Sequence, residues 1–236
     1  MVNPASIYGA TKKVCEALVL NRFPSDPEQK FMVVRFGNVL GSRGSIVPLF
    51  KTQILKGGPV TITHPETSRY FMTIPEAASL VLKAGGVGDN GHLYLLDMGE
   101  PLKIRELAEN MIRFYGHEPD EDIPIEYIGL REGEKVHDAL HEAYEQVAPT
   151  PYARIQEVSG MLDWLTSGPG PTGSPADGIG DRGLSAAAVD QLLAELRPLC
   201  FRIPGQESEY RNRRILRQVL RRHIPSIPEK DNEPEY

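Results

Sequence analysis

The chain has 236 residues, of which 40% are hydrophobic and 25% are charged, and its formal net charge is -6. That length and apolar content suit one large domain or one domain with an appendage, and the acidic balance argues against a general nucleic-acid-binding protein. Two cysteines, Cys15 and Cys200, are too few for a disulfide framework. With no apolar run long enough to cross a bilayer and no signal peptide, we expect a cytoplasmic protein without a membrane span.

The first predicted element is a helix over residues 4–22, with Asn3 as its cap and Pro4 in its first turn. Tyr8 and Lys12 are four residues apart and therefore share one face of this helix. A lysine ammonium close to a phenol favours the phenolate, so the pair is a candidate proton shuttle for a sugar or alcohol hydroxyl. The Tyr-x-x-x-Lys spacing alone is a weak signal, because short motifs arise by chance and often lie on a solvated helix face.

Residues 31–36 form a short apolar run bounded by turn residues, which is typical of a buried parallel strand. A strand that follows a helix favours an α/β sheet. The glycine- and serine-rich segment 37–48 comes next, where ligands of open α/β sheets bind. Small residues let its backbone approach a ligand, and its hydrogen-bond donors are Asn38, Ser42, Arg43 and Ser45. A flexible surface loop is the alternative.

Helices and strands alternate through the rest of the first 145 residues. We expect helices over 49–55, from a Thr73–Glu76 capping box through residue 81, over 103–115, and in a short segment ending at residue 140. Strands are expected over 60–63, 92–97 and 123–128, the last at a sheet edge because it contains a proline. Arg69 is well suited to a bidentate phosphate contact.

The composition changes after about residue 166. Residues 167–183 are rich in glycine and proline without hydrophobic periodicity, which is typical of a linker. Helices are expected over 185–196 and 211–222. The second is the basic cluster of the chain, and an amphipathic helix docked through Ile215 and Leu216 with its arginines in solvent is favoured over a membrane or nucleic-acid contact.

A metal site finds little support. His137 and His141 are four residues apart with Glu142 beside them, but no third ligand follows at a recognisable spacing. We therefore expect a solvated helix face there and no metal.

Six motifs occur in order: VNP at 2–4, YGATK at 8–12, FGNVLGS at 36–42, GSIVP at 44–48, TSRYFMT at 67–73 and GEK at 133–135. Together they resemble the family of UDP-N-acetylglucosamine 4,6-dehydratases and related polysaccharide-biosynthesis dehydratases, which are extended short-chain dehydrogenase/reductases. The resemblance covers residues 2–145. It implies an α/β chain with an incomplete Rossmann sheet and a small α/β nucleotide-sugar domain over 1–165. The change in composition and the helical patterns that follow predict a linker over 166–183 and a helical tail over 184–236.

The resemblance also implies a reaction on a UDP-sugar: NADP or NAD oxidises C4, water leaves across C5 and C6, and the hydride returns to C6. Tyr8 would accept the C4 proton, Lys12 would hold the nicotinamide ribose, and Val39 would lie against the nicotinamide. The implied substrate residues are Asn38, Arg43, Gly44, Ser45 and Ile46, with Arg69, Arg131, Glu132, Gly133 and Glu134 near the UDP portion.

Two parts of the family pattern are missing from this chain. The three Gly-x-Gly-x-x-Gly matches, at 86–91, 168–173 and 178–183, do not lie between a predicted strand and a helix, as a pyrophosphate site requires. The acidic residue and lysine of the elimination step would precede residue 1. We therefore expect the C-terminal portion of such an enzyme, inactive in isolation. A C4 epimerase or reductase, or a non-catalytic UDP-sugar-binding or partner protein, is the alternative, and family members often form homo-oligomers.

Overall fold

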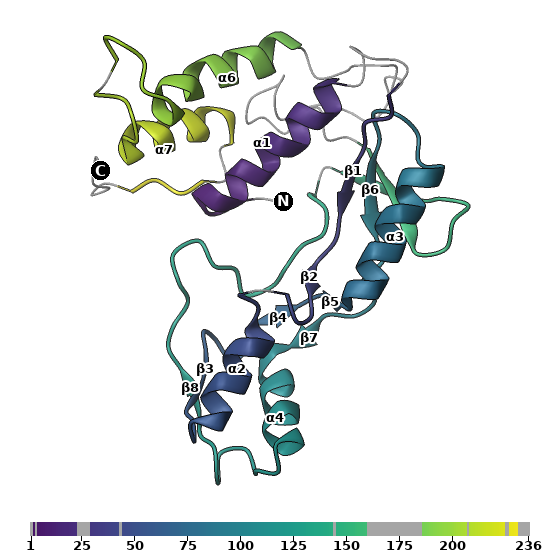
Figure 1. Cartoon of the computed structure of the whole chain (residues 1–236), viewed down its shortest axis with the longest axis vertical. Coiled ribbons are helices and arrows are strands. Elements are labelled where there is room, and N and C mark those ends of the chain that lie inside the picture. Colours follow the sequence, from purple (N-terminus) through teal and green to yellow (C-terminus); the bar gives the residue numbers. More distant parts are fainter. Residues whose placement is uncertain are drawn as a thin grey trace.

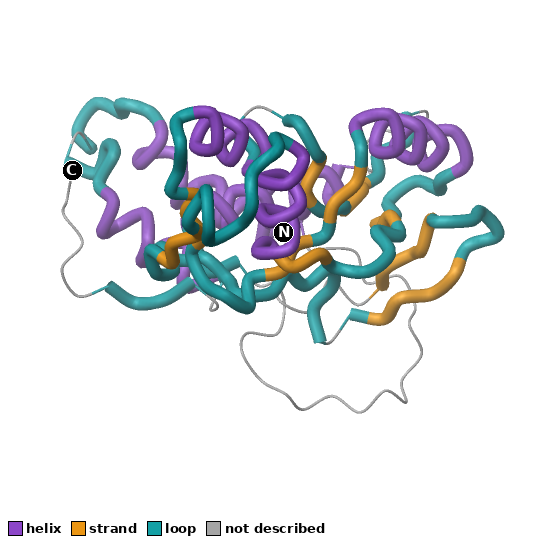
Figure 2. The backbone as a smooth tube through the Cα atoms, turned by 90° about the horizontal axis from the view of Figure 1, so that it is seen from below, coloured by secondary structure: helices purple, strands orange, loops and turns teal. Residues whose placement is uncertain are grey.

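The computed structural model describes residues 2, 4–22, 29–42, 44–143, 145–159, 186–206, 208–224 and 227–230. Its helices are α1 (Ile7–Arg22), α2 (Ile46–Leu55), α3 (Ile74–Val87), α4 (Ile104–Phe114), α6 (Ala186–Cys200) and α7 (Arg213–His223). Its strands are β1 (Val33–Arg35), β2 (Asn38–Val39), β3 (Val60–Ile62), β4 (Ser68–Arg69), β5 (Phe71–Met72), β6 (Leu93–Leu96), β7 (Leu102–Lys103), β8 (Ile125–Tyr127), β9 (Gln146–Pro149) and β10 (Ile155–Ser159). Figure 2 shows that these strands are spread through the molecule in short segments.

The largest sheet has four strands in the order β1-β6-β10-β9. β1 and β6 are parallel, which confirms the parallel strand predicted over 31–36, whereas β10 is antiparallel to both of its neighbours. Alternate residues of a strand face opposite sides. In β6, Leu93 and Leu95 pack towards α1, and Tyr94 and Leu96 pack towards α3. The sheet therefore has a helix on each face (Figure 1), the layering of an α/β fold.

A smaller α/β unit lies below this sheet (Figure 1). It is built on the parallel pair β3 and β8, against which α2 and α4 pack. Ile104, Ala108 and Ile112 of α4 are four residues apart, so they lie on one face and meet Phe50 and Ile54 of α2 in a buried cluster. The short pairs β2–β5 and β4–β7 lie between the two parts of the molecule.

The two C-terminal helices cover α1. Ala10 and Val14 of α1 are buried together with Leu192 of α6 and with Val219 and Leu220 of α7. The docking of α7 through Ile215 and Leu216 is confirmed, because both side chains pack against this same cluster. Helix α1 is thus held between the sheet and the C-terminal helices (Figure 1).

Helix starts follow local hydrogen bonds. Ser6 caps α1, since its Oγ accepts a 3.1 Å hydrogen bond from the amide of Gly9; the predicted start at residue 4 was too early, and Asn3 lies outside the described residues. The predicted capping box of α3 is confirmed. The amide of Thr73 donates to the Glu76 carboxylate at 2.9 Å, and the amide of Glu76 donates to Thr73 Oγ1 at 3.3 Å.

Some predictions were wrong. Residues 136–140 form no helix, and His137 instead makes a β-bridge with Ser68. Strands β9 and β10 were not predicted, because their sequences carry polar residues and no clear alternation; β10 forms by pairing with β6.

The linker predicted over 166–183 lies outside the described residues. Within the described part of the chain, no helix has the length and apolar character of a membrane span.

Candidate functional site

A cavity of about 730 Å³ lies between α1 and β1. One wall is a single face of α1, and the opposite wall is residues 32–38, which include β1 and the turn after it. Residues 138–140 contribute a third side. The residues of α1 that line the cavity are Tyr8, Lys12, Cys15, Glu16 and Val19.

Tyr8 and Lys12 lie side by side in this cavity. The Tyr8 side chain is 70% exposed, and Nζ of Lys12 is 5.3 Å from the centroid of its ring. A cation at this distance is attracted by the electron-rich face of the ring. The phenol can donate and accept a hydrogen bond and the ammonium can donate three, a set of groups that suits the hydroxyls of a sugar or ribose.

Arg35 of β1 is buried between two carboxylates. Its Nη2 lies 2.8 Å from Glu16 of α1, and its Nη1 lies 2.7 Å from Glu145. Burial lowers the pKa of Arg35, but hydrogen bonds to Glu145 and Glu16 outweigh burial and raise it. Burial has the opposite effect on Glu145 and raises its pKa, but the hydrogen bond and charge of Arg35 outweigh burial and bring the pKa of Glu145 below its usual range. The charged triad therefore ties α1 to β1 beside the cavity.

Asn38 is the first residue of β2 and follows the carboxyl end of β1, where the predicted binding segment 37–48 begins. Its side-chain amide donates to the carbonyl oxygen of Tyr70 at 3.1 Å and to the carboxylate of Asp138 at 3.2 Å. Asp138 also lines the cavity, and sequence reasoning missed it, because no spacing relates it to Asn38. Its other oxygen lies 3.6 Å from Nε of Arg69.

The guanidinium of Arg69 is bound by protein atoms. It donates to the carbonyl oxygens of Lys135 and Val136 at 2.7 and 2.9 Å, and one nitrogen lies 3.5 Å from Glu134. Burial lowers the pKa of Lys135, whose Nζ donates to the carbonyl oxygen of Val2 at 2.8 Å. In this structure Arg69 holds the segment after residue 133 in place.

The loop 131–134 packs against the start of α1. Gly133 has φ +73°, and a Cβ atom there would lie 2.7 Å from the carbonyl oxygen of Ala5 and 2.9 Å from Cβ of Ser6. Only glycine fits this contact. The amide of Arg131 donates to the carboxylate of Glu134 at 3.2 Å, which closes the loop.

The glycine- and serine-rich segment is less close to the cavity than expected. Gly44, Ser45 and Ile46 do not line it. Ser45 precedes α2, and among the described residues its buried hydroxyl has no hydrogen-bond partner. Val39 packs against the cluster beneath α3, and Arg43 lies outside the described residues.

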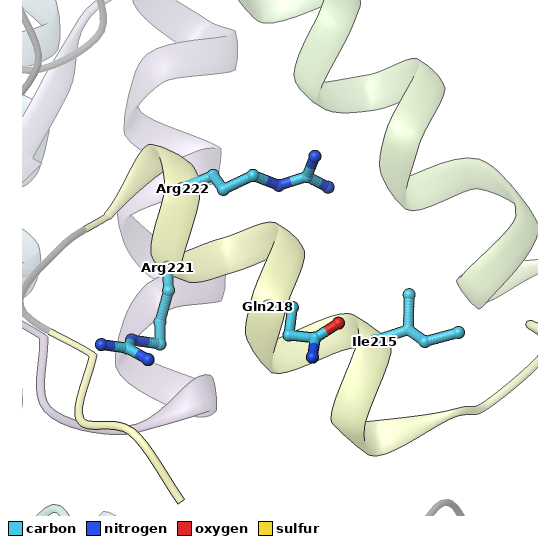
Figure 3. Close-up of a pocket in the computed structure, with 4 residues that line it drawn as sticks. All are labelled: Ile215, Gln218, Arg221 and Arg222. Carbon is cyan, nitrogen blue, oxygen red and sulfur yellow. The ribbon is translucent and has the colours of Figure 1, made fainter.

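A second hollow of about 560 Å³ lies on α7. Figure 3 shows the residues around it: Ile215, Gln218, Arg221 and Arg222. Arg222 extends towards α6 and lies 2.9 Å from Glu195, and Arg221 lies 3.0 Å from Glu229. Both cations are thus paired. The expectation that the arginines of this helix lie in solvent is wrong for Arg217, which is buried.

Among the described residues, no group of three histidine, cysteine, aspartate or glutamate side chains is placed to hold a metal ion. We predicted that His137 and His141 share a helix face, and this prediction is wrong. Nδ1 of His137 lies 2.9 Å from Oγ of Ser68, and Nδ1 of His141 lies 3.0 Å from the carbonyl oxygen of Glu142.

The helix-covered sheet and the Tyr8–Lys12 pair beside β1 define the class of protein: an extended short-chain dehydrogenase/reductase of the Rossmann type, as predicted. The family described as "Polysaccharide biosynthesis protein" matches residues 1–159. The chain belongs to this polysaccharide biosynthesis family, which the ordered motifs had indicated.

The similar proteins are longer than this chain. The capsular polysaccharide biosynthesis protein CapD of Staphylococcus aureus is 54% identical over 139 residues, which are 59% of this chain and 23% of CapD. The probable polysaccharide biosynthesis protein EpsC of Bacillus subtilis is 50% identical over 154 residues, 65% of this chain and 25% of EpsC. The solved structure of Pen from Bacillus thuringiensis superimposes with a TM-score of 0.59 at 35% identity, over 66% of this chain and 49% of Pen.

Proposed function

We propose that the chain forms the substrate-binding and proton-transfer part of a nucleotide-sugar 4,6-dehydratase that acts on UDP-N-acetylglucosamine in polysaccharide synthesis. The observation that supports this best is one cavity lined by Tyr8, Lys12, Asn38 and Asp138. The chain spans about a quarter of the length of CapD and EpsC. The reaction of the whole protein is therefore part of the proposal.

Tyr8 and Lys12 fit the nicotinamide ribose of NADP or NAD. The phenol of Tyr8 and the exposed ammonium of Lys12 line the cavity, and both groups can form hydrogen bonds with ribose hydroxyls. We place Val39 against the nicotinamide ring. Such a cofactor supplies oxidation of the sugar at C4 and return of the hydride to C6, with loss of water across C5 and C6 between the two.

Tyr8 is the proposed proton acceptor for the C4 hydroxyl. A phenolate formed there needs a nearby positive charge, and Lys12 is the cation beside its ring. The buried Arg35 triad keeps α1 against β1, so the pair keeps its place relative to Asn38. This fixed geometry is what general-base catalysis requires.

The remaining proposed contacts lie around the nucleotide sugar. Asn38 would accept a hydrogen bond from a sugar hydroxyl through its side-chain oxygen, because both N–H groups of its amide donate to protein atoms. We also propose Arg43, Gly44, Ser45 and Ile46 as contacts of the nucleotide sugar. Residues 131–134 would face the UDP portion, with the guanidinium of Arg131 as a phosphate donor. Arg69 contributes to that face by holding the segment after residue 133, since its own donors bond protein atoms.

Calorimetry with UDP and UDP-N-acetylglucosamine tests the proposal on the full chain. We expect binding of both. Asn38→Ala should weaken the binding of UDP-N-acetylglucosamine roughly 2- to 10-fold, the range for one lost neutral hydrogen bond, and leave the binding of UDP unchanged. Arg131→Ala should weaken both ligands roughly 10- to 150-fold, the range for one lost hydrogen bond to a charged group. Arg113→Ala is the matched control, because this exposed arginine of α4 lies outside the cavity. A folded chain that gives no heat with either ligand would refute the proposal.

We further propose a cytoplasmic location and a homo-oligomer. Cys15 and Cys200 are both free and exposed, as is usual in a reducing compartment. Leu82 and Phe114 are largely exposed apolar side chains of the kind that contacts between subunits cover. A sedimentation-equilibrium mass equal to that of one chain would exclude the oligomer.

A further inference from the structure

Two cations from the C-terminal part of the chain bind Glu132. Nη2 of Arg217, on α7, donates to Oε1 of Glu132 at 3.2 Å, and Nζ of Lys230 donates to Oε2 at 2.7 Å. Both cations lie beyond residues 1–159, which the family description covers. A carboxylate of the loop 131–134 is therefore bound on both oxygens by the segment that follows the family match.

Arg217 is buried and is held by hydrogen bonds, unlike an arginine on the surface. It is only 7% exposed, and its Nη1 donates to the carbonyl oxygen of Pro228 at 3.2 Å. It thereby joins α7, the segment after α7 and the loop 131–134. Helix α7 is itself anchored, because Val219 and Leu220 are buried against α1.

The loop 131–134 is held from its other side by the start of α1. Gly133 touches Ala5 and Ser6, where no Cβ atom would fit. The loop thus lies between the beginning of the helix that carries Tyr8 and Lys12 and the C-terminal segment. Figure 1 shows α7 and the start of α1 on the same side of the molecule.

The charge of this arrangement matters for an anionic ligand. A lone carboxylate in a loop that faces a diphosphate would repel it. The hydrogen bond and charge of Lys230 and the charge of Arg217 lower the pKa of Glu132, so the group stays ionised and paired. Lys230 and Arg217 thus offset the negative charge of Glu132.

We propose that α7 and residues 227–230 are a built-in support for nucleoside diphosphate binding: Lys230 and Arg217 act as positioning residues that fix the loop 131–134 and neutralise Glu132. The ligand named here rests on the proposed function, whereas the positioning of the loop does not. The C-terminal segment is then a working part of the site and not an appendage.

The test compares Lys230→Ala with the unchanged full chain. Lys230 can be substituted without disturbing the core, because its side chain is 40% exposed and its removal leaves the buried Arg217 in place. Lys103→Ala is the matched control, since it removes another exposed lysine–glutamate pair, with Glu66 at 3.1 Å. Hydrogen exchange of amides 129–135 reports the order of the loop, and calorimetry reports the affinity for UDP.

We expect Lys230→Ala to speed exchange in the loop and to weaken UDP binding roughly 3- to 10-fold, as loss of an exposed charge-assisted hydrogen bond does. Lys230→Arg should restore both, and Lys103→Ala should change neither. Unchanged exchange in Lys230→Ala would overturn the positioning role whether or not UDP binds. Faster exchange with unchanged UDP affinity would overturn the role in ligand binding. If the chain without any substitution does not bind UDP, the proposed function is overturned. The hydrogen-exchange result would then still decide whether Lys230 positions the loop.

Discussion

Asn38 and Asp138 are 100 residues apart in the sequence, and the side-chain amide of the first donates a hydrogen bond of 3.2 Å to the carboxylate of the second. This contact joins the carboxyl end of β1 to the extended segment after the loop 131–134. Both residues line the cavity between α1 and β1. The position of Asn38 in the candidate site therefore depends on a contact between distant parts of the chain.

Exchanging these two side chains should reveal the contact. Asn38→Asp places a carboxylate beside Asp138, so we expect the free energy of unfolding to fall by about 1 kcal/mol at pH 7. Asp138→Asn in the same chain restores a donor–acceptor pair and should recover most of that loss. Urea unfolding of the four chains of this double-mutant cycle measures the coupling. Additive effects of the two substitutions would contradict the predicted pairing.

The buried triad gives a larger expected effect. Arg35→Met leaves Glu16 and Glu145, both less than 10% exposed, without their shared cation. We expect a loss of about 3–5 kcal/mol in unfolding free energy, the range for breaking a buried ion pair from one side. Arg154→Met is the control, because its pair with Glu76 is exposed, and it should cost less than about 1 kcal/mol. Similar losses in the two variants would argue against a structural role for the triad.

The same variant should respond to pH in a defined direction. Burial raises the pKa of Glu145, but the hydrogen bond and charge of Arg35 lower it by more, so the folded-state pKa lies below the ordinary value of a glutamate. A lowered carboxylate pKa stabilises the fold above the unfolded-state pKa, and this stabilisation is lost as the pH falls through the folded-state pKa. Without Arg35, burial raises the pKa of Glu145. The penalty of Arg35→Met should therefore shrink as the pH falls from this raised pKa in the variant to the lowered pKa in the unchanged chain. Denaturant titrations of both chains between neutral and acid pH measure it, and a penalty that grows on acidification would be contrary to the mechanism.

Local patterns predicted much of the fold and long-range contacts decided the rest. Helix α4 lies within one residue of its predicted bounds at each end, because its apolar residues repeat on one face. Strand β10 was missed because it forms by pairing with β6, more than 50 residues earlier, and β9 was missed because it forms by pairing with β10. Tyr8 and Lys12 could be found from spacing within one helix.

The support around that pair could not be read from spacing. Glu16 is 19 residues from Arg35, and Asp138 is 100 from Asn38. The partners of Arg69 include backbone carbonyl groups, which no side-chain pattern records. A phosphate contact is a reasonable expectation for such an arginine, and only the folded chain shows how its donors are used. Sequence reasoning thus located the pair proposed to react better than the groups that hold it.

Two glycine substitutions separate a steric role from a general effect of adding a methyl group. Gly133→Ala puts a Cβ atom 2.7 Å from the carbonyl oxygen of Ala5 at a residue with φ +73°. We expect a loss of roughly 2–4 kcal/mol in unfolding free energy, from the left-handed backbone and the clash together. Gly85→Ala, inside α3 with no atom within 4 Å of the added carbon, should instead stabilise the chain by about 0.4–1 kcal/mol.

Gly133→Ala should also weaken UDP binding, because the loop 131–134 would be pushed away from the start of α1 and from the support of Arg217 and Lys230. Thermal unfolding and UDP calorimetry on both glycine variants measure the two effects separately. The contact between this loop and α1 would have to be abandoned if Gly133→Ala were as stable as Gly85→Ala. If Gly133→Ala lost stability but bound UDP as the unchanged chain does, the loop would serve the fold without serving the nucleotide.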